Sequence, residues 1–109
     1  MTVQRGHIFS LLTGVVGNVI SGNGGNGVRM EASSLSSVVG NHILSNARNG
    51  VLVEVSASAE VRNNTATGNG SGTEQSASPA YDLADLNREC RGNTWVGNRF
   101  GTRNQACIN

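Results

Sequence analysis

Two short segments of the chain alternate between apolar and mostly polar residues with a period of two, which predicts β-strands. Each segment follows directly after an Asn-Gly pair. The alternation predicts that one set of side chains points into a core and that the other set points outward. The inward set is Val28, Met30, Val51 and Val53, and the outward set is Arg29, Glu31, Leu52 and Glu54.

These segments belong to a longer repeat with a period of 23 residues. The pattern Val16-Gly17-Asn18-x-Ile20-x-x-Asn23-x-x-Asn26-Gly27-Val28 returns as Val39-Gly40-Asn41-x-Ile43-x-x-Asn46-x-x-Asn49-Gly50-Val51. A fixed period of about 20 to 50 residues is the signature of stacked-repeat architectures. Parallel stacking brings equivalent side chains of successive coils about 4.8 Å apart, which explains why identical residue types recur in phase. The repeat therefore predicts an all-β solenoid of about four to five coils with parallel strands.

The Asn-Gly pairs at 26–27 and 49–50 leave an alternative open. Asn-Gly is the strongest short signal for a β-hairpin, so an antiparallel meander has to be considered. A meander gives no reason for identical residues to recur every 23 positions, whereas a solenoid does. In a solenoid we expect these pairs to form sharp corners at which glycine adopts a positive φ.

The motif Asn-x-apolar-x-x-Asn occurs four times. Stacked side-chain amides can hydrogen-bond along a column, each amide donating to the carbonyl of the next coil. Asparagine also tolerates a left-handed backbone at corners. The strict recurrence favours such a ladder over exposed turn asparagines that do not contact one another. The predicted ladder residues are Asn18, Asn23, Asn41, Asn46, Asn64, Asn69, Asn93 and Asn98.

The 109 residues have room for a single domain, residues 1–109, which the repeat divides further. Residues 1–15 fit the pattern poorly and are interpreted as a degenerate first coil. A Gly/Ser-rich run at 70–79 interrupts the fourth coil and is predicted to be a protruding loop. After it, Tyr81-Asp82-Leu83 aligns with Val51-Leu52-Val53. Residues 90–109 are predicted to form a C-terminal capping coil.

Composition agrees with a solenoid and excludes several classes of function. Only 4% of residues are aromatic and 37% are hydrophobic, and a solenoid needs only a thin core between neighbouring coils. The net charge of +1 argues against nucleic acid, which usually requires a basic stripe. No apolar stretch approaches the roughly 18 residues of a membrane span.

Two glycine-rich patterns suggest cofactors and fail on inspection. Gly22-x-Gly24-x-x-Gly27 matches the dinucleotide fingerprint, but a strand follows it where the fingerprint needs a helix. The Gly- and Asn-rich turns are similar to a calcium-binding nonapeptide repeat, which needs Asp ligands, and no Asp precedes Asp82. We therefore expect no cofactor and no metal.

The spacing Asn-x-Ile-x-x-Asn followed by Gly-Val-x-apolar resembles the right-handed parallel β-helix repeat of the pectate-lyase-like superfamily. The resemblance covers about residues 16 to 109, and the segments Tyr81–Asn87 and Cys90–Thr102 look like the C-terminal coil of such proteins. It implies an all-β, right-handed parallel β-helix. It implies little about chemistry, because the superfamily includes lyases, hydrolases, epimerases, phage proteins and uncharacterised members.

A β-helix must close its ends, because an open final coil exposes unpaired backbone groups. At the C-terminal end the candidates are Trp95, Phe100 and a Cys90–Cys107 disulfide, with two free buried thiols as the alternative. A disulfide would favour a secreted or cell-surface protein. At the N-terminal end no capping helix is recognisable, so we expect another subunit or further residues to cover the first coil.

Four outward polar residues are the candidate ligand-facing groups, namely Arg29, Glu31, Glu54 and Asp82. Stacking would place Glu31 beside Glu54, which would raise the pKa of one carboxyl by like-charge repulsion. The alternative is a solvated face on which Arg29 compensates Glu31. We therefore predict a non-catalytic β-helix module that forms a homo-oligomer through its open N-terminal end, with a carbohydrate as a candidate ligand. The alternative is the C-terminal fragment of a polysaccharide lyase, hydrolase or epimerase.

Overall fold

The computed structural model describes residues 2–3, 6–8, 13–30, 36–54, 59–70 and 80–109. The described residues form short β-strands and one 3-10 helix, η1 (Arg88–Cys90), and no helix among them is long and apolar enough to cross a membrane. The strands are β1 (Thr2–Val3), β2 (Gly6–Ile8), β3 (Thr13–Val16), β4 (Val19–Ser21), β5 (Val28–Met30), β6 (Ser36–Val39), β7 (His42–Leu44), β8 (Val51–Val53), β9 (Glu60–Arg62), β10 (Thr65–Thr67), β11 (Leu83–Asp85), β12 (Thr94–Val96) and β13 (Arg99–Phe100).

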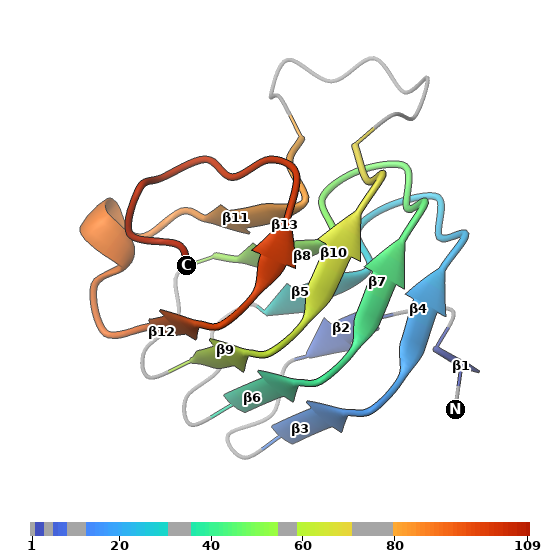
Figure 1. Ribbon diagram of the computed structural model, residues 1–109, viewed down its shortest axis with the longest axis horizontal. Helices are drawn as coiled ribbons and strands as arrows, with labels where there is room; N and C mark the ends of the chain where they lie inside the picture. The colour runs from blue at the N-terminus through green and yellow to red at the C-terminus, as the bar shows by residue number, and fades with distance from the viewer. Residues whose placement is uncertain (1, 4–5, 9–12, 31–35, 55–58, 71–79) are drawn as a thin grey trace.

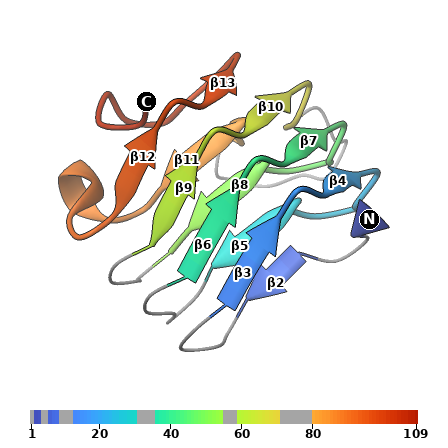
Figure 2. The ribbon, with the colours of Figure 1, turned by 60° about the horizontal axis from the view of Figure 1, so that its bottom comes forward.

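The strands form three sheets, and each sheet takes one strand from each successive coil (Figure 1). Their orders are β1-β4-β7-β10-β13, β11-β8-β5-β2 and β12-β9-β6-β3. Consecutive strands of the chain therefore lie in different sheets, and the chain returns to the same sheet after one full circuit (Figure 2). Every strand pairing is parallel, which confirms the predicted solenoid and rules out the antiparallel meander.

The pairing register follows the 23-residue repeat. In the sheet of β5 and β8, Val28 pairs with Val51 and Met30 with Val53. Because side chains alternate along a strand, this register brings the apolar residues of neighbouring coils together inside the solenoid. The interior is filled by short columns of such residues, including Ile20, Ile43 and Ala66, Val28, Val51 and Leu83, and Val38, Val61 and Trp95.

Two features of the second and third coils differ from the prediction. Leu52, expected to point into solvent, is only 8% exposed, since it stacks between Arg29 and Ala84 in neighbouring strands. Gly27 and Gly50 do not have positive φ. They are glycines because the coils approach closely there, and a Cβ on Gly27 would lie 2.7 Å from the Gly50 carbonyl oxygen.

The positive φ values occur instead at the residue before each ladder asparagine. Among them are Gly17, Gly40, Asn63 and Gly97, which precede Asn18, Asn41, Asn64 and Asn98, and Gly22, Ser45 and Gly68, which precede Asn23, Asn46 and Asn69. Glycine adopts this conformation without steric cost, which explains the frequency of the Gly-Asn pair in the sequence. The left-handed residue turns the chain, and the asparagine that follows then points inward.

The alignment after the interruption at 70–79 was also wrong by two residues. Leu83, and not Tyr81, pairs with Val51, so that β11 continues the sheet of β8. Residues 71–79 of the predicted loop lie outside the described residues. The shift occurs because Asp82 occupies a corner position, as described below.

Candidate functional site: the asparagine columns and the ends of the solenoid

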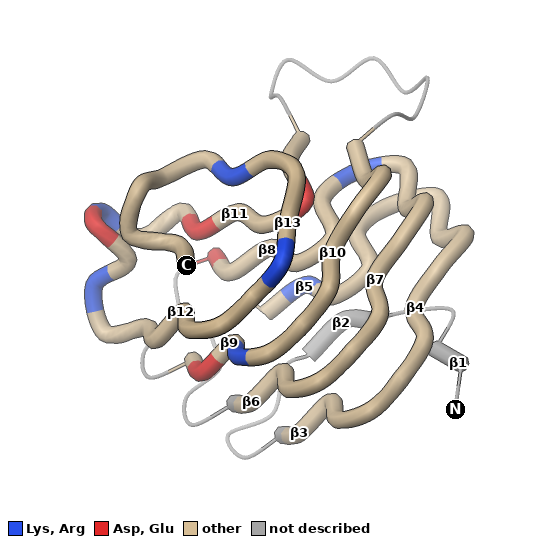
Figure 3. The backbone as a smooth tube through the Cα atoms, in the orientation of Figure 1, with Lys and Arg blue, Asp and Glu red and all other residues tan. Residues whose placement is uncertain are grey.

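The candidate ligand-facing residues divide into two groups. Arg29 lies on β5 and Glu54 directly follows the neighbouring strand β8, and Figure 3 shows a basic position on β5 near an acidic position at the end of β8. The Arg29 Nη2 atom donates to Glu54 Oε2 at 3.1 Å and to Oε1 at 3.3 Å. Their side chains are 38% and 24% exposed, so this pair contributes at most about 1 kcal/mol. Glu31 lies outside the described residues. Among the described residues Arg29 pairs with Glu54, and its compensation of Glu31 stays a prediction.

Asp82 was predicted to lie on the outer face, and this prediction was wrong. Its side chain is only 3% exposed and takes part in a corner of the solenoid. Its Oδ1 atom accepts from the backbone N–H of Asn69 at 3.0 Å and from Asn69 Nδ2 at 2.9 Å. Its Oδ2 atom accepts from the N–H groups of Gly101 and Thr102, each at 3.0 Å, and from Thr102 Oγ1 at 3.3 Å. A carboxylate accepts without donating, so Asp82 ends a chain of donors.

The predicted asparagine ladder forms two columns of the same polarity. In both, the backbone N–H of one asparagine donates to the Oδ1 atom of the asparagine in the next coil. The side-chain Nδ2 atom donates to that same Oδ1 atom at Asn23, Asn41, Asn46 and Asn64. For example, Asn41 donates from N and from Nδ2 to Asn64 Oδ1, both at 2.9 Å. The first column is Asn18, Asn41, Asn64 and Asn98, and the second is Asn23, Asn46, Asn69 and Asp82.

A third column, which the repeat did not predict, runs with the opposite polarity. The N–H and Nδ2 of Asn49 donate to Asn26 Oδ1, both at 3.1 Å, and Asn49 Oδ1 accepts from the Tyr81 N–H at 2.7 Å. Here donors point toward the N-terminal end of the solenoid. The recurrence of Asn-Gly at 26–27 and 49–50 is the sequence signal for this column, but the same pair is also typical of a turn.

The prediction for Asn93 was wrong. Asn98 takes the place in the first column that was expected for Asn93, because Thr94 pairs with Glu60 and not with Thr65. Asn93 Oδ1 accepts from the Ala59 N–H at 3.0 Å, and its Nδ2 donates to Asp85.

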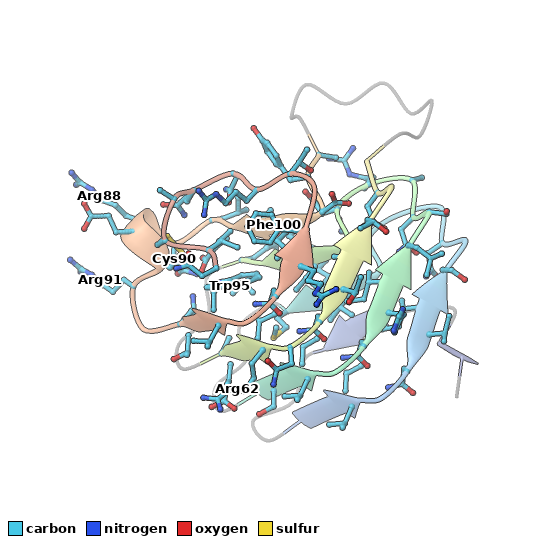
Figure 4. The ribbon with its side chains drawn as sticks, in the orientation of Figure 1. Arg62, Arg88, Cys90, Arg91, Trp95 and Phe100 are labelled. Atoms are coloured by element: carbon cyan, nitrogen blue, oxygen red, sulfur yellow. A yellow bond between two sulfur atoms is a disulfide. The ribbon has the colours of Figure 1, made fainter. Side chains whose placement is uncertain are left out.

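The C-terminal end is closed by a buried carboxylate and a disulfide. Asp85 is fully buried, and its Oδ2 accepts from Trp95 Nε1 at 2.8 Å and from Asn93 Nδ2 at 3.0 Å. The Cys90–Cys107 disulfide joins η1 to the final segment, with the two Cα atoms 6.0 Å apart. Figure 4 shows Cys90 and Trp95 in this coil. The disulfide and Trp95 were predicted as the closure, whereas Asp85 gave no sequence signal.

The N-terminal end differs, because β1, β2 and β3 end the three sheets. Val15 begins the column that continues through the fully buried Val38 and Val61, yet Val15 is only partly buried. Asn23 is 8% exposed, and its Oδ1 atom accepts no hydrogen bond in the described part of the chain. Asn46 Oδ1, one coil further on, accepts two.

A family model described as periplasmic copper-binding protein (NosD) matches residues 8–109, almost the whole chain. The chain belongs to the NosD family. This is a family of right-handed parallel β-helices, which agrees with the three parallel sheets and the asparagine columns. No curated protein and no solved structure matches the chain.

The description of the NosD family raises the question whether the residues present fit a copper ion. Proteins bind copper through imidazole, thiolate and thioether groups. Here Cys90 and Cys107 are joined in the disulfide, Met30 is fully buried in the apolar core, and His42 lies on β7, in a different sheet from His7. Among the described residues, no three His, Cys, Asp or Glu side chains form a group that fits a metal ion. The described donors do not fit copper.

Proposed function

We propose that this chain is a non-catalytic β-helix module that associates with a second copy through its N-terminal coil. The observation that supports this proposal is the difference between the two ends. One end is closed by Asp85, Trp95 and the disulfide, whereas at the other the sheets end in β1, β2 and β3, and Val15 on β3 is only partly buried.

An end of this kind favours association for two physical reasons. Unpaired strand edges offer rows of N–H and C=O groups for pairing with another chain. Val16 on β3 is 63% exposed, so apolar surface accompanies the edge. Burying such surface stabilises a complex by about 25 cal/mol per Å² before the cost of association is subtracted.

Sedimentation velocity over a wide range of protein concentration tests the proposal, with a matched pair of substitutions. Val16 and Val96 lie in the same outward row of one sheet, on its two end strands β3 and β12, and are 63% and 50% exposed. Val16→Lys places a charge on the N-terminal edge and should abolish association. Val96→Lys should leave it intact. A wild-type monomer at every concentration, or equal effects of the two substitutions, would contradict the proposal.

Carbohydrate binding on the outer face around Arg29 and Glu54 is a second proposal. Its support is the partly exposed ion pair, since uronate carboxylates are natural partners for an arginine guanidinium. Titration with uronate oligomers should show binding that Arg29→Ala removes. Release of unsaturated or reducing ends during the titration would favour the alternative, a fragment of a polysaccharide-degrading enzyme. Asp82 and Asp85 do not support that alternative, because their oxygens accept structural hydrogen bonds.

The place of action proposed here is an oxidising compartment, such as the periplasm named in the family description. The Cys90–Cys107 disulfide supports it, because disulfides persist in such compartments and are rare in the cytosol. Copper binding is not part of the proposal, because the described donors do not come together.

A further inference from the structure

Four Asn-Gly pairs lie in the corners that follow β4, β7 and β10, at residues 23–24, 26–27, 49–50 and 69–70. In such a pair the backbone nitrogen of the glycine can attack the side-chain amide of the asparagine, because glycine has no side chain to hinder the approach. The attack requires a glycine N–H that is not held by an acceptor and an asparagine side chain that can rotate. Hydrogen bonds to either group therefore protect a pair.

At three of the four pairs the glycine N–H is held by a carbonyl oxygen of a neighbouring coil. These bonds run from Gly27 to Asn49 at 2.9 Å, from Gly50 to Tyr81 at 3.0 Å and from Gly70 to Asn46 at 3.0 Å. The Gly24 N–H, in contrast, donates to no acceptor in the described part of the chain. Gly24 is also exposed, and a Cβ placed on it would have no neighbouring atom within 4 Å. Its nitrogen is therefore the one that can act as a nucleophile.

The side chain of Asn23 is also held less firmly than that of Asn69, which lies in the same column two coils further on. Asn23 Nδ2 donates a single hydrogen bond, to Asn46 Oδ1 at 2.8 Å, and Asn23 Oδ1 accepts none in the described part of the chain. Asn69 Nδ2 donates three hydrogen bonds, and Asn69 Oδ1 accepts two. The burial of Asn23 does not prevent the attack, because the nucleophile belongs to the next residue of the chain.

We propose that Asn23 is a site of deamidation in the folded chain. The Gly24 nitrogen forms a bond to Asn23 Cγ, the bond between Cγ and Nδ2 breaks, and Nδ2 leaves as ammonia with the proton of the Gly24 N–H. A solvent water then opens the succinimide ring at either of its carbonyl–nitrogen bonds, which gives aspartate or isoaspartate. The reaction needs no oxidant, reductant or cofactor, and it is independent of the self-association proposed above.

Deamidation breaks the second asparagine column at Asn23. A carboxylate cannot donate, so an oxygen would face Asn46 Oδ1 where Asn23 Nδ2 donates in the intact chain. Isoaspartate also lengthens the backbone by one methylene, directly after the left-handed Gly22. Either product therefore loosens the contact between the coil of β4 and the coil of β7.

The same change at Asn26 would have little effect on the third column. Asn26 Oδ1 accepts from the N–H and from the Nδ2 atom of Asn49, both at 3.1 Å. A carboxylate at this position retains both hydrogen bonds, because each of its oxygens is an acceptor. Asn26 is therefore a matched control for Asn23 in the same corner.

Peptide mapping of the folded wild-type chain after incubation at mildly alkaline pH tests the proposal. All eight cationic side chains are arginines, so trypsin places Asn23, Asn49 and Asn69 in the separate peptides 6–29, 49–62 and 63–88. Fragmentation of the first peptide distinguishes Asn23 from Asn26. A protected pair must give up a backbone hydrogen bond before it reacts, so Asn23 should convert about tenfold or more faster than Asn69. In urea, with the chain unfolded, all four pairs should convert at similar rates.

Gly24→Ala identifies the nucleophile. Gly24 does not have a positive φ and has open space around it, so the variant should fold like the wild type. The new methyl group hinders the attack, and most of the conversion at Asn23 should be lost while that at Asn69 is unchanged. An unchanged rate at Asn23 in this variant overturns the proposal. Equal rates at Asn23 and Asn69 in the folded wild type, or faster conversion at Asn26 or Asn49, overturn it as well.

Asn23→Asp and Asn26→Asp test the consequence of the modification with the same added charge. Asn23→Asp removes the donor to Asn46 and leaves two oxygens facing each other, so Tm should fall by about 4–8 °C. Asn26→Asp retains both hydrogen bonds to Asn49 and should leave Tm unchanged. Equal effects of the two substitutions would show that deamidation at Asn23 does not loosen the column.

Discussion

Replacing Asn41 by alanine removes one complete level of the first asparagine column. Asn41 is 1% exposed, and its side chain makes three hydrogen bonds. Its Oδ1 accepts from the Asn18 N–H at 2.8 Å, and its Nδ2 donates to the Val15 carbonyl at 2.8 Å and to Asn64 Oδ1 at 2.9 Å. Asn64 Oδ1 retains the Asn41 backbone N–H after the change.

The expected loss follows from these contacts. Three hydrogen bonds contribute about 1 kcal/mol each, and a buried group left without a partner adds to that cost. We therefore expect Asn41→Ala to lower the free energy of unfolding by about 3–5 kcal/mol, a large part of the roughly 5–15 kcal/mol typical of a domain. Urea unfolding followed by far-ultraviolet circular dichroism measures this difference.

Asn63→Gly is the control. Asn63 is exposed and has a φ of 56°, a conformation that glycine adopts freely. The free energy of unfolding of the Asn63→Gly variant should therefore differ from that of the wild type by less than about 1 kcal/mol. A loss below about 1 kcal/mol for Asn41→Ala as well would refute the view that the column holds the coils together.

Three further predictions concern the packing of the coils and the C-terminal closure. Gly50→Ala should destabilise the fold by more than about 2 kcal/mol, because the new Cβ would clash with the Asp82 carbonyl oxygen and the Asn69 side chain. Gly24→Ala is its control and should be neutral in the same urea assay, because a Cβ at Gly24 would have no neighbouring atom within 4 Å. Replacing both Cys90 and Cys107 by alanine should cost about 3 kcal/mol and lower Tm, whereas an unchanged Tm would show that the disulfide does not stabilise the last coil. Asp85→Asn should lower the free energy of unfolding by about 2–4 kcal/mol, because each carboxylate oxygen accepts from two N–H donors and the new NH2 group would face two of them. The fluorescence of the single tryptophan should shift to longer wavelength, and an unchanged spectrum would contradict the role of this carboxylate.

The solenoid could be predicted from the sequence because each coil repeats the packing requirements of the coil before it. A register in which Val28 meets Val51 requires like residues at equal spacing, and that spacing is visible without coordinates. The same holds for Asn18, Asn41 and Asn64, each of which is buried at the same corner of successive coils. Periodicity predicted these positions because each one is determined by its equivalent in the next coil.

Several predictions failed where the period ends. Asp82 was aligned by counting residues across the interruption at 70–79, but its position is determined by the donors of Asn69, Gly101 and Thr102. Asn93 was assigned to the column by motif, although the longer fourth coil places Asn98 there. Asp85 has no equivalent in earlier coils, where Met30 and Val53 occupy the position, so only the contact with Trp95 identifies it.

Successive coils stack in parallel register with their asparagines in columns. Nuclear Overhauser contacts in the assigned protein test this arrangement most directly. The structure predicts contacts between the side-chain amide protons of Asn41 and the neighbouring Asn18 and Asn64, together with the Hα-to-amide pattern of parallel strands between β6 and β9. Close Hα-to-Hα contacts between those strands, or asparagine side-chain amides without contacts to one another, would contradict it.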